Sequence, residues 1–113
     1  MARPPAFKFE TSEAGPRVAV AVHGELDLAT APELDAEFER VAALDGLELV
    51  IVDLRELAFM DSAGLETLLK LDARTRAADV ELAVVRGPRA VERLFAVTQL
   101  DRRLRIVDDP AAL

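Results

Sequence analysis

The sequence of 113 residues contains no cysteine and a single histidine, His23. These absences exclude disulfides, thiolate clusters and multi-histidine metal sites. No apolar run approaches the roughly 20 residues that cross a bilayer, and the first five residues lack the apolar core of a signal peptide. We therefore expect a protein of a reducing, cytoplasmic setting that is not directed to a membrane.

Basic residues are too few for a nucleic-acid binder, because the net charge is −7 and such binding depends on lysine and arginine neutralising phosphates. We expect no direct nucleic-acid contact. The charge is also uneven: residues 1–69 carry 14 acids and 5 bases, whereas residues 70–113 carry 7 acids and 9 bases. The acids gather between residues 25 and 39, where they form either a solvated helix face or a surface that attracts a basic partner.

Apolar residues make up 51% of the chain of 113 residues. A chain of this length and composition can form one hydrophobic core but is too short for two ordinary domains. We expect a single domain over residues 1–113 with frayed ends at 1–5 and 108–113. Alternating or continuous apolar runs predict strands over residues 6–11, 17–23, 47–54, 80–85 and 104–107. Helical spacing predicts helices that begin at Thr30, Asp61 and Gly87-Pro88.

The resulting order, β-β-α-β-α-β-α-β, predicts an α/β fold with a small mixed sheet. The sheet begins with an antiparallel hairpin and is otherwise parallel. Residues 24–29 read as a loop, and Thr30-Ala31-Pro32-Glu33 has the spacing of a capping box. Apolar residues at helical spacing predict the buried stripes of the first two helices, Leu34, Phe38, Val41 and Ala42, then Leu65, Leu68, Leu69 and Ala73.

The junction Asp61-Ser62 is the candidate working site, because a buried strand and an apolar stretch stop there and a helix begins. A helix start has unpaired backbone N–H groups and a partial positive charge, so it suits an anion. Ser62 could cap the helix, attack a substrate or accept a phosphate. Attack is disfavoured, because Met60 stands where a nucleophile elbow has glycine and only His23, at a strand end, is available as a base.

Carboxylates at loops and strand ends, Glu25, Asp27, Asp53 and Asp61, are the candidates for a magnesium pocket. The five glycines are scattered singly, however, and form no phosphate loop. We therefore expect no cofactor, no metal and no catalytic activity. Gly64 either simply starts the helix or keeps the surface beside Ser62 flat for another protein.

The apolar residues just before this junction, Leu57, Phe59 and Met60, should mostly join the core because they follow a buried strand. Part of the segment can nevertheless remain exposed. An apolar rim beside a modifiable serine makes an effective switch, because phosphorylation adds about −1.5 to −2 charges that must be desolvated on docking.

Five segments together resemble the STAS domains of bacterial anti-sigma factor antagonists, over about residues 7–107. They are Gly24-Glu25-Leu26-Asp27, Thr30-Ala31-Pro32-Glu33-Leu34, Ile51-Val52-Asp53-Leu54, Phe59-Met60-Asp61-Ser62-Ala63-Gly64-Leu65 and Val91-Glu92-Arg93-Leu94-Phe95. The resemblance implies a non-enzymatic binding module whose Ser62 is phosphorylated by an anti-sigma factor that is also a serine kinase. A serine phosphatase then reverses the modification.

By the same resemblance, the unphosphorylated form binds the anti-sigma factor and releases the sigma factor for transcription. The implied partner-binding residues are Glu25, Asp27, Thr30, Asp61, Ser62, Ala63, Gly64 and Leu65. A second reading keeps the fold without the switch and makes the chain a subunit of a larger signalling or transport assembly. One departure is the C-terminus, where family members usually carry a longer last helix than Pro110–Leu113 allows.

Overall fold

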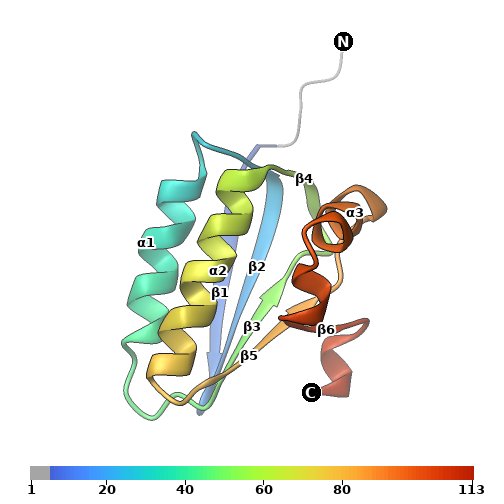
Figure 1. Cartoon of the computed structure of the whole chain (residues 1–113). Helices are drawn as coiled ribbons and strands as arrows, with labels where there is room; N and C mark the ends of the chain where they lie inside the picture. The colour runs from blue at the N-terminus through green and yellow to red at the C-terminus, as the bar shows by residue number, and fades with distance from the viewer. Residues whose placement is uncertain (1–5) are drawn as a thin grey trace.

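A computed structural model describes residues 6–113, and its elements are arranged as a six-stranded sheet with helices packed on it (Figure 1). The strands are β1 (Lys8–Ala14), β2 (Arg17–Leu26), β3 (Leu49–Asp53), β4 (Leu57–Met60), β5 (Glu81–Val85) and β6 (Arg105–Val107). The helices are α1 (Ala31–Ala42), α2 (Ser62–Ala77) and α3 (Arg89–Val97), with 3₁₀ turns η1 (Leu100–Arg102) and η2 (Pro110–Ala112). None of the helices in this part of the chain is long and apolar enough to cross a membrane.

The sheet confirms the predicted class, because β1 and β2 form an antiparallel hairpin and the remaining pairs are parallel, in the order β1-β2-β3-β5-β6. Val18, Val20 and Val22 point to the core as the alternation predicted. The hairpin is longer than expected, since β1 runs to Ala14 and β2 runs on to Leu26. Residues 24–26, predicted as loop, are therefore strand, with a bulge between Gly24 and Glu25.

A further strand, β4, was missed by the sequence analysis. It pairs with the end of β2 in parallel, matching Glu25 with Phe59 and Leu26 with Met60. Four residues with two exposed side chains in the middle show neither a clean alternation nor a buried run, so no local pattern marks them as strand. This pairing positions the Asp61-Ser62 junction. The pairing is visible only in the tertiary structure.

Helices α1 and α2 lie side by side against the sheet (Figure 1), and the core cluster joins them to β2, β3, β5 and α3. The stripe of α1 is confirmed at Leu34, Phe38 and Val41, while Ala42 is only half-buried. In α2 the prediction was wrong at Ala73, which is exposed. The buried stripe of α2 turns instead through Leu65, Leu68, Leu71, Asp72 and Thr75.

The opposite face of the sheet carries a second, smaller apolar cluster, formed by Leu49, Ile51, Ala83 and Val85. Leu113 packs against this cluster from the C-terminal turn. Residues 110–112, which we expected to fray, form the 3₁₀ turn η2, and the Asp109 side chain caps it through the Ala111 N–H. The predicted frayed end at residues 1–5 lies outside the described residues.

Candidate functional site

Ser62 is the first residue of α2, and its side chain is exposed. The preceding Asp61 is the N-cap: its Oδ1 accepts hydrogen bonds from the N–H groups of Ala63 (2.9 Å) and Gly64 (3.3 Å). Because Asp61 satisfies these N–H groups, the Ser62 hydroxyl is not needed as a cap. It takes part in no side-chain hydrogen bond within residues 6–113. The hydroxyl is thus accessible to another molecule.

The strand pair β2–β4 places the end of β2 and the acidic loop that follows it, residues 27–30, beside this helix start. The Asp61 N–H donates to the Leu26 carbonyl at 3.2 Å, directly joining the two segments. Glu25 lies opposite Phe59 in the register, and its half-buried carboxylate makes no ion pair or hydrogen bond within the described chain. The structure therefore places the end of β2, which carries Glu25, beside the segment that leads into Asp61 and Ser62.

Asp27 and Thr30 build the loop before α1. Asp27 Oδ1 accepts from the N–H groups of Ala29 (2.9 Å) and Thr30 (3.1 Å), and Thr30 Oγ1 donates to the Glu25 carbonyl at 2.9 Å. The predicted capping box is wrong: Thr30 occupies the N-cap position, but its hydroxyl accepts the Asp27 N–H and makes no cap bond. Both side chains are half-buried and engaged in this loop, so they shape the surface more than they offer free polar groups.

Gly24 lies in β2, at the bulge that precedes this loop. Its φ is +85°, a conformation that L side chains rarely adopt. A Cβ there would lie 2.5 Å from the Ala6 carbonyl oxygen. The close approach of the backbone requires glycine, which lets β2 bulge and continue towards β4.

Gly64 and Leu65, predicted as partner-binding residues, are buried beneath the surface around Ser62. A Cβ at Gly64 would lie 2.7 Å from Met60 Cγ and 3.0 Å from Leu26 Cδ2. The idea that Gly64 flattens the surface for a partner is therefore wrong. Its function is to let α2 pack closely on β2 and β4, while Ala63, half-buried, remains at the surface.

Replacing Gly64 by alanine should destabilise the protein. The added methyl group meets two neighbours at sub-van der Waals distance, and Leu26 is fully buried and cannot move aside freely. We expect a loss of about 1–3 kcal/mol in the free energy of unfolding, measured by urea denaturation. Ser62→Ala, two residues away and exposed, is the control and should change little; equal stability of the Gly64→Ala variant and the wild type would contradict the packing argument.

The surface beside Ser62 is shallow. A groove of about 230 Å³ runs between the first turns of α1 and α2. Its lining combines small residues with a charged rim and one exposed leucine, and the residues are Leu28, Ala31, Pro32, Asp35, Ala63, Glu66, Thr67 and Lys70. A hydrolase or phosphatase site combines a concave pocket with convergent polar groups around the reacting side chain, and Ser62 does not line this groove. The shape suits contact with another protein.

His23 is not placed as a base for Ser62. It alternates with Val22, which faces the helices, so its side chain lies on the opposite face of the sheet. Its Nε2 is buried without a hydrogen-bond partner, and the charge of Asp53 is close enough for the two groups to interact. Among residues 6–113, no group of three or more His, Asp or Glu side chains could hold a metal ion.

Asp53 belongs to an ion pair and does not join a pocket with the other carboxylates. Burial raises the pKa of its carboxyl, but this is outweighed by hydrogen bonds from the Arg55 side chain and backbone, so the pKa lies below its usual value. The guanidinium donates from Nε to Oδ1 at 3.0 Å and from Nη2 to Oδ2 at 2.8 Å.

This lowered pKa predicts that a small part of the free energy of unfolding is lost in acid. The unfolded chain binds the Asp53 proton at higher pH than the folded chain, so the stabilisation is complete above the unfolded pKa of about 4 and is lost as the pH falls through the folded value. Asp53→Asn should flatten the acid limb of the unfolding free energy below about pH 4, by less than about 1 kcal/mol because the pair is half-exposed. Asp101→Asn, at an exposed carboxylate, is the control; an unchanged acid limb in Asp53→Asn would contradict the ion-pair argument.

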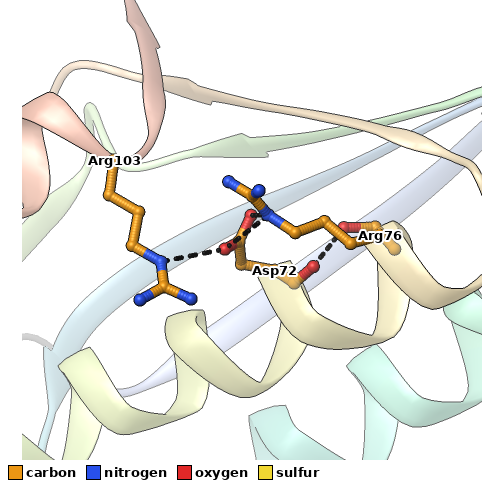
Figure 2. Close-up of polar contacts among 4 residues, drawn as sticks. Asp72, Arg76 and Arg103 are labelled. Atoms are coloured by element: carbon orange, nitrogen blue, oxygen red, sulfur yellow. Dashed lines mark hydrogen bonds and ion pairs between the residues drawn. The ribbon is translucent and has the colours of Figure 1, made fainter.

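A second polar cluster lies away from Ser62, ten residues further along α2. Figure 2 shows the buried carboxylate of Asp72 between Arg76 and Arg103, which donate from Nε at 3.1 Å and 3.4 Å. Thr75 Oγ1 donates to the Asp72 carbonyl at 3.0 Å. Because Arg103 follows η1, the cluster ties the segment before β6 to α2. Paired buried charge of this kind is structural, and the sequence analysis did not predict it because the partners are 31 residues apart.

The sequence analysis also missed two exposed apolar residues, Leu28 and Val97. Leu28 and Val97 are 79% and 76% exposed, and with Phe59 they are the exposed large hydrophobic side chains of the described chain. Leu28 lines the groove beside Ala63, and Val97 lines a cleft with Phe59. Leu28 lies in the turn between β2 and α1, and Val97 is the last residue of α3, so no periodic pattern covers either position.

Comparison with known proteins gives consistent results. The family model of the STAS domain matches residues 8–112. Osmosensory protein A of Mycobacterium tuberculosis is 35% identical over 75 residues, which cover 66% of this chain and 46% of that protein, so the chain spans about half of the relative's length.

Solved structures share the fold. An anti-sigma factor antagonist from Mycobacterium paratuberculosis superposes with a TM-score of 0.81 at 23% identity, covering 95% of this chain and 90% of the other. The anti-sigma factor antagonist SpoIIAA superposes in its unphosphorylated form with a TM-score of 0.78 at 20% identity, covering 95% and 92%. Its phosphorylated form, a Bacillus protein, gives 0.72 at 20% identity, covering 95% and 96%.

Proposed function

Because this chain belongs to the STAS domain family, we propose that it is an anti-sigma factor antagonist switched by phosphorylation of Ser62. In this proposal the unphosphorylated chain binds an anti-sigma factor that carries serine kinase activity, and so frees a sigma factor. The kinase then phosphorylates Ser62 and the complex separates. A serine phosphatase restores the binding form, all in the cytoplasm.

The observation that supports the proposal most strongly is that Asp61 and Ser62 have different roles at the start of α2. Asp61 caps the helix, and the neighbouring Ser62 hydroxyl is exposed and unengaged in the described chain. A kinase can reach such a hydroxyl without unfolding the helix. The partial positive charge of the helix N-terminus also favours the phosphate that results.

The surroundings of Ser62 suit a protein partner. Exposed apolar side chains lie in the adjoining loop and strand, at Leu28 and Phe59. Glu25 adds a carboxylate without an ion-pair partner in the described chain. A phosphate placed among these groups adds like charge beside Glu25 and Asp61 and must be desolvated when a partner covers it, so docking and phosphorylation compete.

The direct test is phosphorylation by the serine-kinase anti-sigma factors of the native host, each purified and incubated with this chain and ATP. We expect mass spectrometry to find one phosphate, on Ser62, and size-exclusion chromatography to find the complex only before phosphorylation. The chain has only two serines, so Ser12→Ala is a matched control for Ser62→Ala. Phosphate on Ser12 but not Ser62, or no complex with any of these proteins, would overturn the proposal.

A further inference from the structure

An apolar patch lies between β4 and α3. It consists of Phe59, Ala90, Leu94 and Val97, which with Met60 and Arg93 line a cleft of about 260 Å³. We call these four residues the α3–β4 patch. Phe59 is 46% exposed and Val97 is 76% exposed, so a large part of the patch faces solvent.

The patch exists because the apolar arc of α3 is wider than its packing requires. Val91 and Phe95 are buried and attach α3 to the core. Ala90, Leu94 and Val97 recur at helical spacing beside them, and only Leu94 is partly covered. Apolar surface that the fold leaves exposed in this way marks a site of interaction more often than a scattered single residue does.

The rim of the patch carries two basic side chains that have no ion-pair partner within residues 6–113. Arg93 lines the cleft, and Arg89 lies one helical turn before it on the same side of α3. Neither guanidinium forms an ion pair or hydrogen bond within residues 6–113, and neither does that of Arg102, whereas the arginines at positions 74, 76, 86, 103 and 105 all form ion pairs. Two free cations beside exposed apolar groups complement a segment that is apolar and acidic.

We propose that the α3–β4 patch binds an amphipathic acidic segment of the anti-sigma factor, with an apolar side chain in the cleft and a carboxylate on Arg93. This proposal rests on the proposed function, since it names a second contact for the same partner. The surface around Ser62 is therefore mixed in charge: Glu25 lies opposite Phe59 in the β2–β4 register, whereas Arg89 and Arg93 lie on α3.

The position of the patch supports one continuous interface. Phe59 precedes Ser62 by three residues, so their Cα atoms are at most roughly 11 Å apart. A standard interface buries about 800 Å² on each partner, and a protein centred on Ser62 therefore extends over neighbouring surface at this distance. A partner that covers Ser62 and β4 reaches the patch without a separate docking event.

The test measures the affinity of the unphosphorylated chain for the anti-sigma factor by titration calorimetry and surface plasmon resonance. Val97→Ser and Arg93→Glu should each weaken binding about tenfold, and Arg93→Glu should also slow association and reduce its salt dependence. Ala96→Ser, exposed on the same helix, and Arg17→Glu, exposed at the start of β2, are the matched controls and should bind like the wild type. Circular dichroism melts should show all four variants folded.

The outcomes separate this inference from the function on which it rests. If the wild type binds and phosphorylation of Ser62 abolishes binding, but Val97→Ser and Arg93→Glu bind like their controls, the patch proposal alone is wrong. If the wild type binds no anti-sigma factor, the proposed function is wrong and this occupant with it. Self-association of the wild type that Val97→Ser removes, with unchanged anti-sigma binding, would identify a second copy of the chain as the occupant and also overturn the proposal.

Discussion

Ser62→Asp is expected to bind the anti-sigma factor at least tenfold more weakly than the wild type, and the Ser62 phosphoprotein about a hundredfold more weakly. A hundredfold change corresponds to only about 2.7 kcal/mol. The carboxylate adds one negative charge at an exposed position next to Asp61, and a partner must desolvate that charge to dock. Phosphate adds up to about twice that charge, which explains the order of the two effects.

The substitution should not damage the fold, so a loss of binding is attributable to the interface. Ser62 is the first residue of α2, where a negative charge is favourable by about 0.3–1 kcal/mol. The Asp61 cap is left intact. Melting temperature and affinity should therefore change in opposite directions. Ser62→Ala is the matched control and should bind like the wild type, and equal binding by Ser62→Asp and the wild type would refute the switch.

Leu26→Ala is expected to cost about 2–5 kcal/mol of unfolding free energy, the usual range for truncating a buried leucine. Leu26 is fully buried at the end of β2, beside Met60 of β4 and the Gly64 backbone. Its carbonyl also accepts the Asp61 N–H. The cavity would therefore open under the start of α2, and the loss is a large share of the 5–15 kcal/mol that a domain of this size possesses.

Urea denaturation of Leu26→Ala and Leu28→Ala measures this effect with a control in the same segment. Leu28 lies two residues further on and is 79% exposed, so its truncation should change stability by no more than about 0.5 kcal/mol. A loss below 1 kcal/mol for Leu26→Ala would show that β2 and β4 are not packed as described. If Leu28→Ala weakens partner binding while Leu26→Ala lowers stability, Leu28 belongs to the binding surface and Leu26 to the core that supports it.

The position of the candidate site was predicted from the sequence, but its construction was not. Asp61 and Ser62 stood out because a helix start follows an apolar stretch, and both are where the sequence placed them. Gly64 and Leu65 were assigned to the surface and are buried. Sequence spacing shows that residues share a helix face, but it does not show whether that face meets the core or solvent, and here β4 decides the matter.

The sequence by itself determined the α/β class, the initial hairpin, the helix start at Asp61 and the resemblance that led to the STAS family. These features depend on residues adjacent along the chain: period-two and helical spacing, and the cap residue before an apolar stripe. Only the tertiary structure decided that β4 pairs with β2, that Thr30 bonds backward to the Asp27 N–H, and that Phe59 and Val97 meet in one exposed cleft. The first and the last bring together segments far apart along the chain, which no local pattern relates. The Thr30 bond is local, but the sequence does not show which of the nearby N–H groups the hydroxyl accepts.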